Sequence, residues 1–211
     1  MSGVVATLTS AGEQAMALAK SLTLDADDWH HLARAFHRAE ALAEQALVVA
    51  IAQVRPELRP ALVSQLDDER RHVGVFAEWV DGAPLPPVQA SDKQRPEVVW
   101  LTLLLANEVA GYCQFRLLEG VCGASERGRA VAAVASDEVA HVARLVTWLQ
   151  EPRYARARSQ LVRVMDSFIA GLEARMSQFL PREAHLLVRG GMADLIGQTL
   201  GALLALRPPG S

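Results

Sequence analysis

The chain has 211 residues, of which 51% are hydrophobic, and its formal net charge is −3. This length suffices for one compact core, so we expect a single domain over residues 1–211. The small negative charge gives no general attraction for nucleic acid or an anionic membrane. The first residues lack the pattern of a secretory signal and no membrane span is predicted, so we expect a cytoplasmic protein.

Hydrophobic residues recur at helical spacing along nearly the whole chain, and strict alternation is absent, which predicts an all-α fold. A first helix is expected over residues 10–22. A second begins near Asp25 or Asp27, either of which can cap its free N–H groups, and ends near residue 54. A third covers about 60–80.

Residues 82–96 are rich in proline and too long for a tight turn, so they are predicted to be a crossover connection. Helices over about 96–121 and 126–150 follow, separated by a Gly-Ala-Ser turn. Two antiparallel pairs joined by a long crossover predict a four-helix bundle with its core over about 26–150.

Two further helices are expected over about 154–180 and 182–206, with a break at Pro181. The last of them contains small residues spaced so that another helix could approach closely. We interpret it as a contact in a homodimer or a cover over the core, with an ordinary packing helix as the alternative.

A Glu-x-x-His motif occurs twice, as Glu69 with His72 and as Glu138 with His141. Residues at i and i+3 lie on one face of a helix, so each pair can reach one metal ion. A single match would be weak support. Two matches in corresponding helices of the two hairpins are a much more specific signal.

Each hairpin also has a Glu level with its motif. Glu40 precedes the first turn by about as many residues as Glu69 follows it, and Glu108 and Glu138 flank the second turn in the same way. Because every helix rises about 1.5 Å per residue, all four carboxylates can lie in one layer of the bundle.

Exposed or ion-paired helix positions are the alternative interpretation, but the neighbours of Glu40 and Glu108 are apolar. Four buried carboxylates would be strongly destabilising unless two divalent cations offset their charge. Carboxylate and imidazole ligands favour iron, with manganese also possible, over structural zinc. The sequence predicts a dinuclear metal site with these ligands: Glu40, Glu69, His72, Glu108, Glu138 and His141.

One Glu from each of two helices and Glu-x-x-His from each of the other two resemble the ferritin-like di-iron carboxylate proteins over about residues 36–150. The resemblance implies that Glu69 and Glu138 bridge two irons. Asp68 and Asp137, which precede the motif glutamates, resemble aspartates of ribonucleotide reductase small subunits and bacterial monooxygenases. They would hydrogen-bond a ligand His, with an ordinary surface charge as the alternative.

Two neighbouring residues have several possible roles. Glu44, one turn after Glu40, could be a further ligand, a proton carrier or an outward charge. Tyr112, one turn after Glu108, could line the same cavity or pack as an ordinary core phenol.

The size of the chain is similar to that of compact members of the superfamily, such as aldehyde-deformylating oxygenases and tRNA-modifying hydroxylases. The resemblance implies an oxidase or oxygenase that uses two Fe ions and O₂ on a small, largely apolar substrate, with electrons from a ferredoxin or reductase. A ferroxidase or peroxide-reducing protein is one alternative. A tRNA hydroxylase is another alternative. Its only electrostatic support is a basic cluster of Arg153, Arg156, Arg158 and Arg163, and a run of charges like this one is usually a solvated helix face.

Overall fold

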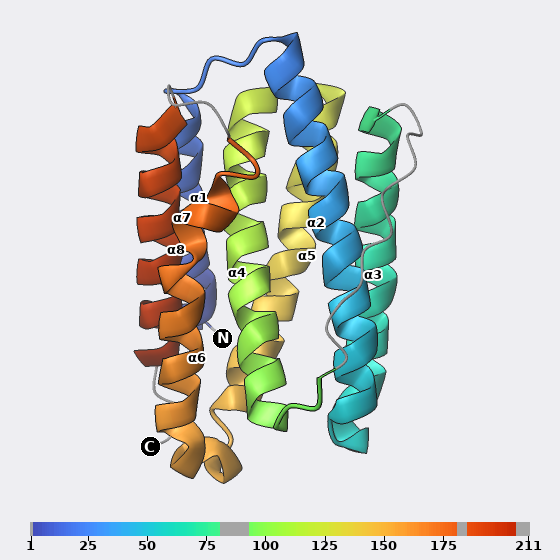
Figure 1. The fold of residues 1–211 in the computed structure, drawn as a ribbon, viewed down its shortest axis with the longest axis vertical. Helices are drawn as coiled ribbons and strands as arrows, with labels where there is room; N and C mark the ends of the chain where they lie inside the picture. The colour runs from blue at the N-terminus through green and yellow to red at the C-terminus, as the bar shows by residue number, and fades with distance from the viewer. Residues whose placement is uncertain (1, 81–92, 181–184, 206–211) are drawn as a thin grey trace.

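A computed structural model describes residues 2–80, 93–180 and 185–205, and all regular structure in these ranges is helical. The all-α fold class predicted from the sequence is therefore confirmed. Figure 1 shows the helices α2 (Ala26–Gln53), α3 (Arg59–Ala77), α4 (Glu97–Cys122) and α5 (Glu126–Leu149) lying side by side, with the other helices gathered beside α4.

Short connections join these helices into two hairpins. A 3₁₀ turn over Pro56–Leu58 links α2 to α3, and Gly123, with a φ of 58°, begins the turn between α4 and α5. The starts of α2 and α5 carry the side-chain caps that their sequences favour. The Asp25 carboxylate accepts from the N–H of Asp28 at 2.9 Å, and Ser125 Oγ accepts from the N–H of Gly128 at 3.1 Å.

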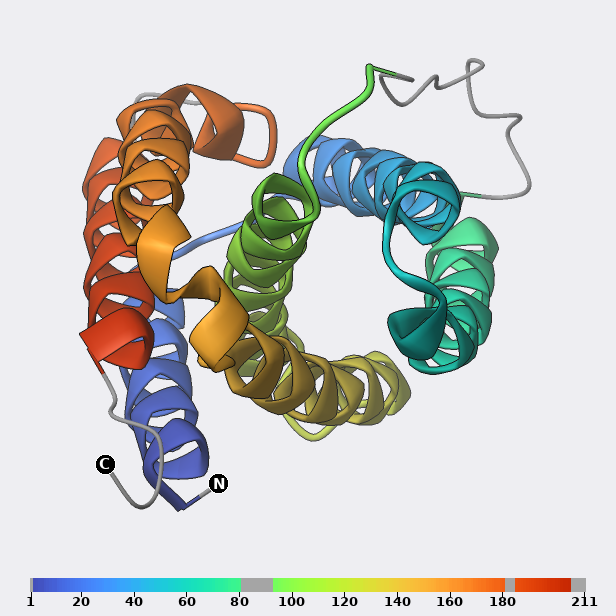
Figure 2. The same ribbon diagram turned by 90° about the horizontal axis from the view of Figure 1, so that it is seen from below.

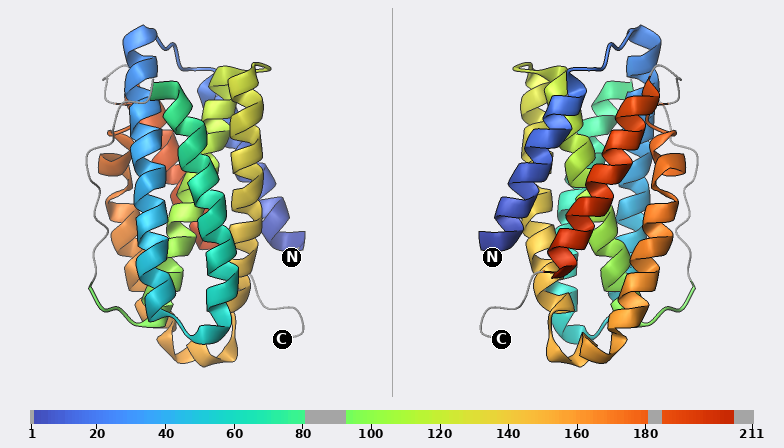
Figure 3. Two further views of the ribbon diagram at one scale, coloured as in Figure 1. Left: turned by 90° about the vertical axis from the view of Figure 1, so that its right-hand side faces the viewer. Right: turned by 90° about the vertical axis from the view of Figure 1, so that its left-hand side faces the viewer.

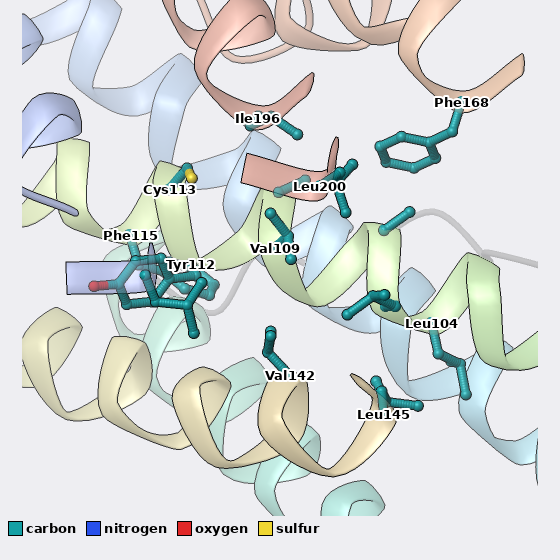
Figure 4. Packing of buried hydrophobic residues seen from close by; sticks show 14 of the residues in the cluster. Leu104, Val109, Tyr112, Cys113, Phe115, Val142, Leu145, Phe168, Ile196 and Leu200 are labelled. Atoms are coloured by element: carbon teal, nitrogen blue, oxygen red, sulfur yellow. The ribbon is translucent and has the colours of Figure 1, made fainter. Parts of the chain in front are cut away.

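The α4 helix is covered on both sides. Seen along the long helices in Figure 2, α1 (Ser2–Ala19), α6 (Arg158–Ala170) and α8 (Leu186–Ala205) form a second layer beside α4 and α5. Figure 4 shows Val109 and Leu104 of α4 between Val142 and Leu145 of α5 and Ile196 and Leu200 of α8. By length and composition α4 could cross a membrane, but 83% of its most apolar window is buried inside the molecule.

Two of the expected helices differ from the structure. The first helix begins at Ser2, well before residue 10, because Val4 and Leu8 are buried and extend its packing face. The helix expected over 154–180 is broken into a 3₁₀ segment, α6 and α7 (Leu172–Met176), with the break at Gly171. Most of the predicted crossover and the predicted break at Pro181 lie outside the described residues.

An ion-pair network closes one end of the two hairpins. Arg55, in the turn after α2, donates from Nη1 to Glu97 Oε1 at 2.9 Å and from Nη2 to Glu151 Oε1 at 2.6 Å. Tyr154 hydrogen-bonds both Arg55 and Glu97. Arg55 thereby ties the α2–α3 turn to the start of α4 and the end of α5, which fixes the relative height of the hairpins. Figure 3 shows from one side the α2–α3 hairpin with α5, and from the other α1 and α8 crossing the opposite face.

Candidate metal centre

The structure brings together all six residues that the sequence predicted as metal ligands. Glu40 comes from α2, Glu69 and His72 from α3, Glu108 from α4, and Glu138 and His141 from α5. Every one is buried, with an exposed fraction between 1% and 6%. The equal distances of the glutamates from their turns therefore do place the carboxylates in one layer.

The six residues form two groups that share two members. One group is Glu40, Glu69, His72 and Glu138, and the other is Glu69, Glu108, Glu138 and His141. Within each group, one potential ligand atom per residue lies within 4.8 Å of all the others. Each group could hold a metal ion, and Glu69 and Glu138 are positioned to reach both ions.

The orientation of the two imidazoles matches that of metal ligands. Nδ1 of His141 lies 3.0 Å from Glu108 Oε2 and 3.3 Å from Glu138 Oε2, while Nδ1 of His72 lies 3.6 Å from Glu138 Oε1. The opposite ring nitrogens face aspartates. An Nε2–H donated to a carboxylate leaves the Nδ1 lone pair free for a metal.

Each of the two aspartates pairs with the histidine of the other motif. His72 Nε2 lies 3.1 Å from Asp137 Oδ2, and His141 Nε2 lies 3.0 Å from Asp68 Oδ2. Each Asp therefore contacts the His of the other motif, and the pair of hydrogen bonds joins α3 to α5. The role expected for Asp68 and Asp137 is consistent with this geometry.

Arg71 covers the two aspartates from the solvent side. Its Nη2 lies 2.7 Å from Asp68 Oδ1 and 3.4 Å from Asp137 Oδ2, and its side chain is 57% exposed. One guanidinium thus connects the aspartates that hold both imidazoles. The second motif has Ala140 at the corresponding position, so this connection comes from α3 alone.

Sequence reasoning missed Gln65, which is fully buried one turn before Glu69. Its Nε2 donates to Glu108 Oε1 at 2.8 Å. The spacing of four residues from Glu69 places both side chains on one face of α3, and that spacing could have indicated its role. Gln65 fixes the carboxylate of Glu108 across the interface between the hairpins.

Burial and mutual repulsion perturb the acids of the cluster. Burial, with the nearby Glu108 carboxylate, raises the pKa of Glu69 to about 8, and the same causes raise the pKa of Glu138 well above its usual value. Burial alone would lower the pKa of His72, but the carboxylates of Glu40 and Glu69 raise it to about 10. Without metal, the cluster therefore retains protons at neutral pH.

The donor set fits two divalent cations. Glu40 Oε2 and His72 Nδ1 are buried and have no hydrogen-bond partner among the described residues, although they lie only 3.4 Å apart. Buried polar atoms without partners are rare in native proteins and are explained when an ion binds them. Four carboxylates and two imidazoles would supply the charge and the ligand atoms for a pair of ions.

Glu44 and Tyr112 lie away from the cluster. Glu44 pairs with the exposed Arg70 at 3.2 Å, which agrees with the outward charge among its possible roles. Of the two roles open to Tyr112, its position agrees with the packed core phenol, because its hydroxyl oxygen lies beside Gly12 of α1, only 2.5 Å from where a Cβ on that glycine would be. The position of α1 against this flank of α4 makes Tyr112 a packed core phenol.

Aromatic side chains border the cluster on one side. Phe115 lies edge-on to His72, with ring centroids 6.4 Å apart, and packs against Phe36 and Phe76 at 5.7 and 5.8 Å. These rings exclude water from the His72 side. Two pockets in the described structure, of about 760 and 410 Å³, are lined by none of the six cluster residues.

No protein-family model, curated protein or solved structure matches the chain. The candidate metal centre rests on the burial and the distances of the six residues themselves.

Replacing Asp137 with alanine is expected to weaken the binding of a divalent metal ion by about 10- to 100-fold, because His72 loses the acceptor that orients its ring. Anaerobic competition against a chelator measures this change. Asp67→Ala is the matched control, since Asp67 is an exposed aspartate on α3 that pairs only with Arg70 among the ion pairs found. Equal affinity in the two variants would contradict the orienting role.

Proposed function

We propose that the protein is a ferritin-like di-iron oxidase or oxygenase that uses O₂ to oxidise a small, largely apolar substrate. The observation that carries the proposal is the pair of four-residue groups sharing Glu69 and Glu138. A shared carboxylate holds two ions close enough to act together. When bound, two ferrous ions would supply electrons jointly to O₂, and an external ferredoxin or reductase would restore them.

The chain's own residues would hold this pair of ions in a rigid, dry setting. Asp68 and Asp137 keep the imidazoles oriented, and Gln65 holds one oxygen of Glu108. The ring of Phe115 shields His72 from solvent. Exclusion of water strengthens the electrostatic interactions at such a site and protects reactive species formed there.

A ferroxidase is the second candidate, and one observation favours it. The two larger pockets described above are lined by none of the six cluster residues, so neither would place an organic substrate beside the ions. Fe(II) and O₂ themselves are small enough to enter without such a pocket. A tRNA hydroxylase gains less support, because Arg153 of the basic cluster is paired with Glu151 at 3.0 Å.

Anaerobic loading with Fe(II), followed by metal counting and by Mössbauer and absorption spectra before and after O₂, tests the proposal. We expect about two irons per chain, both oxidised by O₂, with spectra typical of a coupled pair. Glu44→Gln is the matched control and should bind and oxidise the same amount. One isolated iron per chain, or no reaction with O₂, would overturn the proposal; repeated oxidation of excess Fe(II) would favour the ferroxidase.

A further inference from the structure

A pocket of about 410 Å³ lies between the start of α4 and the helices α6 and α7. Three arginines line it, Arg95, Arg163 and Arg175, and no acidic side chain does so among the described residues. We name it the arginine pocket. None of the six cluster residues lines it, and Phe168, which does, lies on the side of α4 away from the α5 residues Val142 and Leu145 (Figure 4), so the pocket is separate from the candidate metal centre.

Two of the three guanidinium nitrogens of Arg175 lack an acceptor among the described residues. Its guanidinium carbon lies 4.1 Å from the centre of the Phe168 ring. Nε and Nη2 are buried and have no hydrogen-bond partner among the described residues. Burial lowers the pKa of Arg175, and no described carboxylate counters that effect. A guanidinium desolvated in this way leaves strong donors unsatisfied.

Arg95, which also lines the pocket, has a similar arrangement. Its backbone N–H donates to Gln53 Oε1 at 2.9 Å, and its guanidinium carbon lies 5.6 Å from the Trp100 ring centre. Nε of Arg95 is also buried without a partner among the described residues. The arginines Arg55 and Arg71, by contrast, both bind carboxylates. Nε of Arg116 and Nε of Arg189, outside the pocket, are likewise buried without a partner among the described residues, so what distinguishes this pocket is that two such arginines, Arg95 and Arg175, line it together.

We propose that the arginine pocket binds a small organic oxyanion, a phosphate monoester or a carboxylate with an apolar body. Guanidinium groups bind such oxyanions through paired, charge-assisted hydrogen bonds. Gln160 and Ser167 add neutral hydrogen-bonding groups, while Phe168 and the aliphatic residues of α4 and α6 form an apolar wall. The volume is within the range of pockets for small molecules, about 300–1,000 Å³. This inference does not depend on the proposed di-iron function.

Calorimetric titration of the full chain with phenyl phosphate, benzoate and the neutral benzyl alcohol tests the inference. At least one of the two anions should bind saturably, and the tighter one identifies the preferred oxyanion. Arg175→Gln should weaken that binding by about tenfold or more, the usual effect of losing a charge-assisted hydrogen bond. Arg163→Gln should also weaken it, and because Arg163 is exposed this variant keeps the test usable if Arg175→Gln does not fold.

Arg153→Gln is the matched control, since it removes the same charge from an exposed arginine outside the pocket. It should leave the affinity for the anion unchanged. Equal loss of affinity in Arg153→Gln and the pocket variants would show a general charge effect and overturn the inference. Binding of benzyl alcohol as tight as that of both anions, or no binding of either anion, would also overturn it.

Discussion

Replacing Glu138 with alanine is expected to reduce the metal content from the proposed two ions per chain to less than one, because Glu138 belongs to both groups that could hold an ion. Its two oxygens lie 3.6 Å from His72 Nδ1 and 3.3 Å from His141 Nδ1, so each faces a different group. Glu40 belongs to one group alone. We therefore expect Glu40→Ala to retain about one ion per chain. Metal analysis after anaerobic loading and desalting measures both.

Folding is not expected to confound this comparison. The raised pKa of Glu138 keeps this carboxyl protonated in the metal-free cluster near neutral pH, so its replacement removes no buried charge, and the Glu138→Ala chain should fold with unchanged helix content by circular dichroism. Glu44→Gln, which changes a carboxylate outside both groups, should keep the full metal content. Equal losses in Glu40→Ala and Glu138→Ala would contradict the shared position of Glu138.

The layer of four glutamates could be predicted from the sequence because helix rise is constant. Counting residues from each turn places Glu40 level with Glu69, and Glu108 level with Glu138, without knowledge of the contacts between helices. The structure brings these residues together as counted. The all-α fold and the caps at Asp25 and Ser125 were likewise predictable, since both depend on local spacing and local hydrogen bonds.

Features that depend on how helices approach one another could not be predicted in this way. Asp68 lies four residues before His72 on α3, yet it bonds His141 on α5. Whether each aspartate bonds the histidine of its own helix or that of the other hairpin depends on how closely the two hairpins approach. The position of Tyr112 depends on α1, and no sequence pattern near Tyr112 or Gly12 indicates that α1 packs against α4. The break at Gly171 also depends on tertiary packing, because a single glycine is tolerated inside many helices.

Raising the pH from about 6 to about 8 is expected to destabilise the metal-free protein, in contrast to the usual behaviour of paired acids. The pKa of Glu69 is raised from 4.5 to about 8 in the native state. Between these values the native state holds a proton that the unfolded chain has released, so unfolding becomes more favourable as pH rises. His72, raised from 6.5 to about 10, acts in the same direction. Each such proton changes the free energy of unfolding by at most about 1.4 kcal/mol per pH unit.

Bound metal should reverse this dependence, because the ions displace the protons and neutralise the carboxylates. Urea unfolding at several pH values, with chelator or with saturating Fe(II) under anaerobic conditions, measures the free energy of unfolding in both states. Glu69→Gln cannot release the proton, so its metal-free form should show a shallower decline. A metal-free wild type whose stability is constant or rises from pH 6 to pH 8 would contradict the proton-loaded cluster. The difference in the free energy of unfolding between the metal-bound and metal-free protein should therefore grow as pH rises. Bound metal would then be a major contributor to stability near neutral pH.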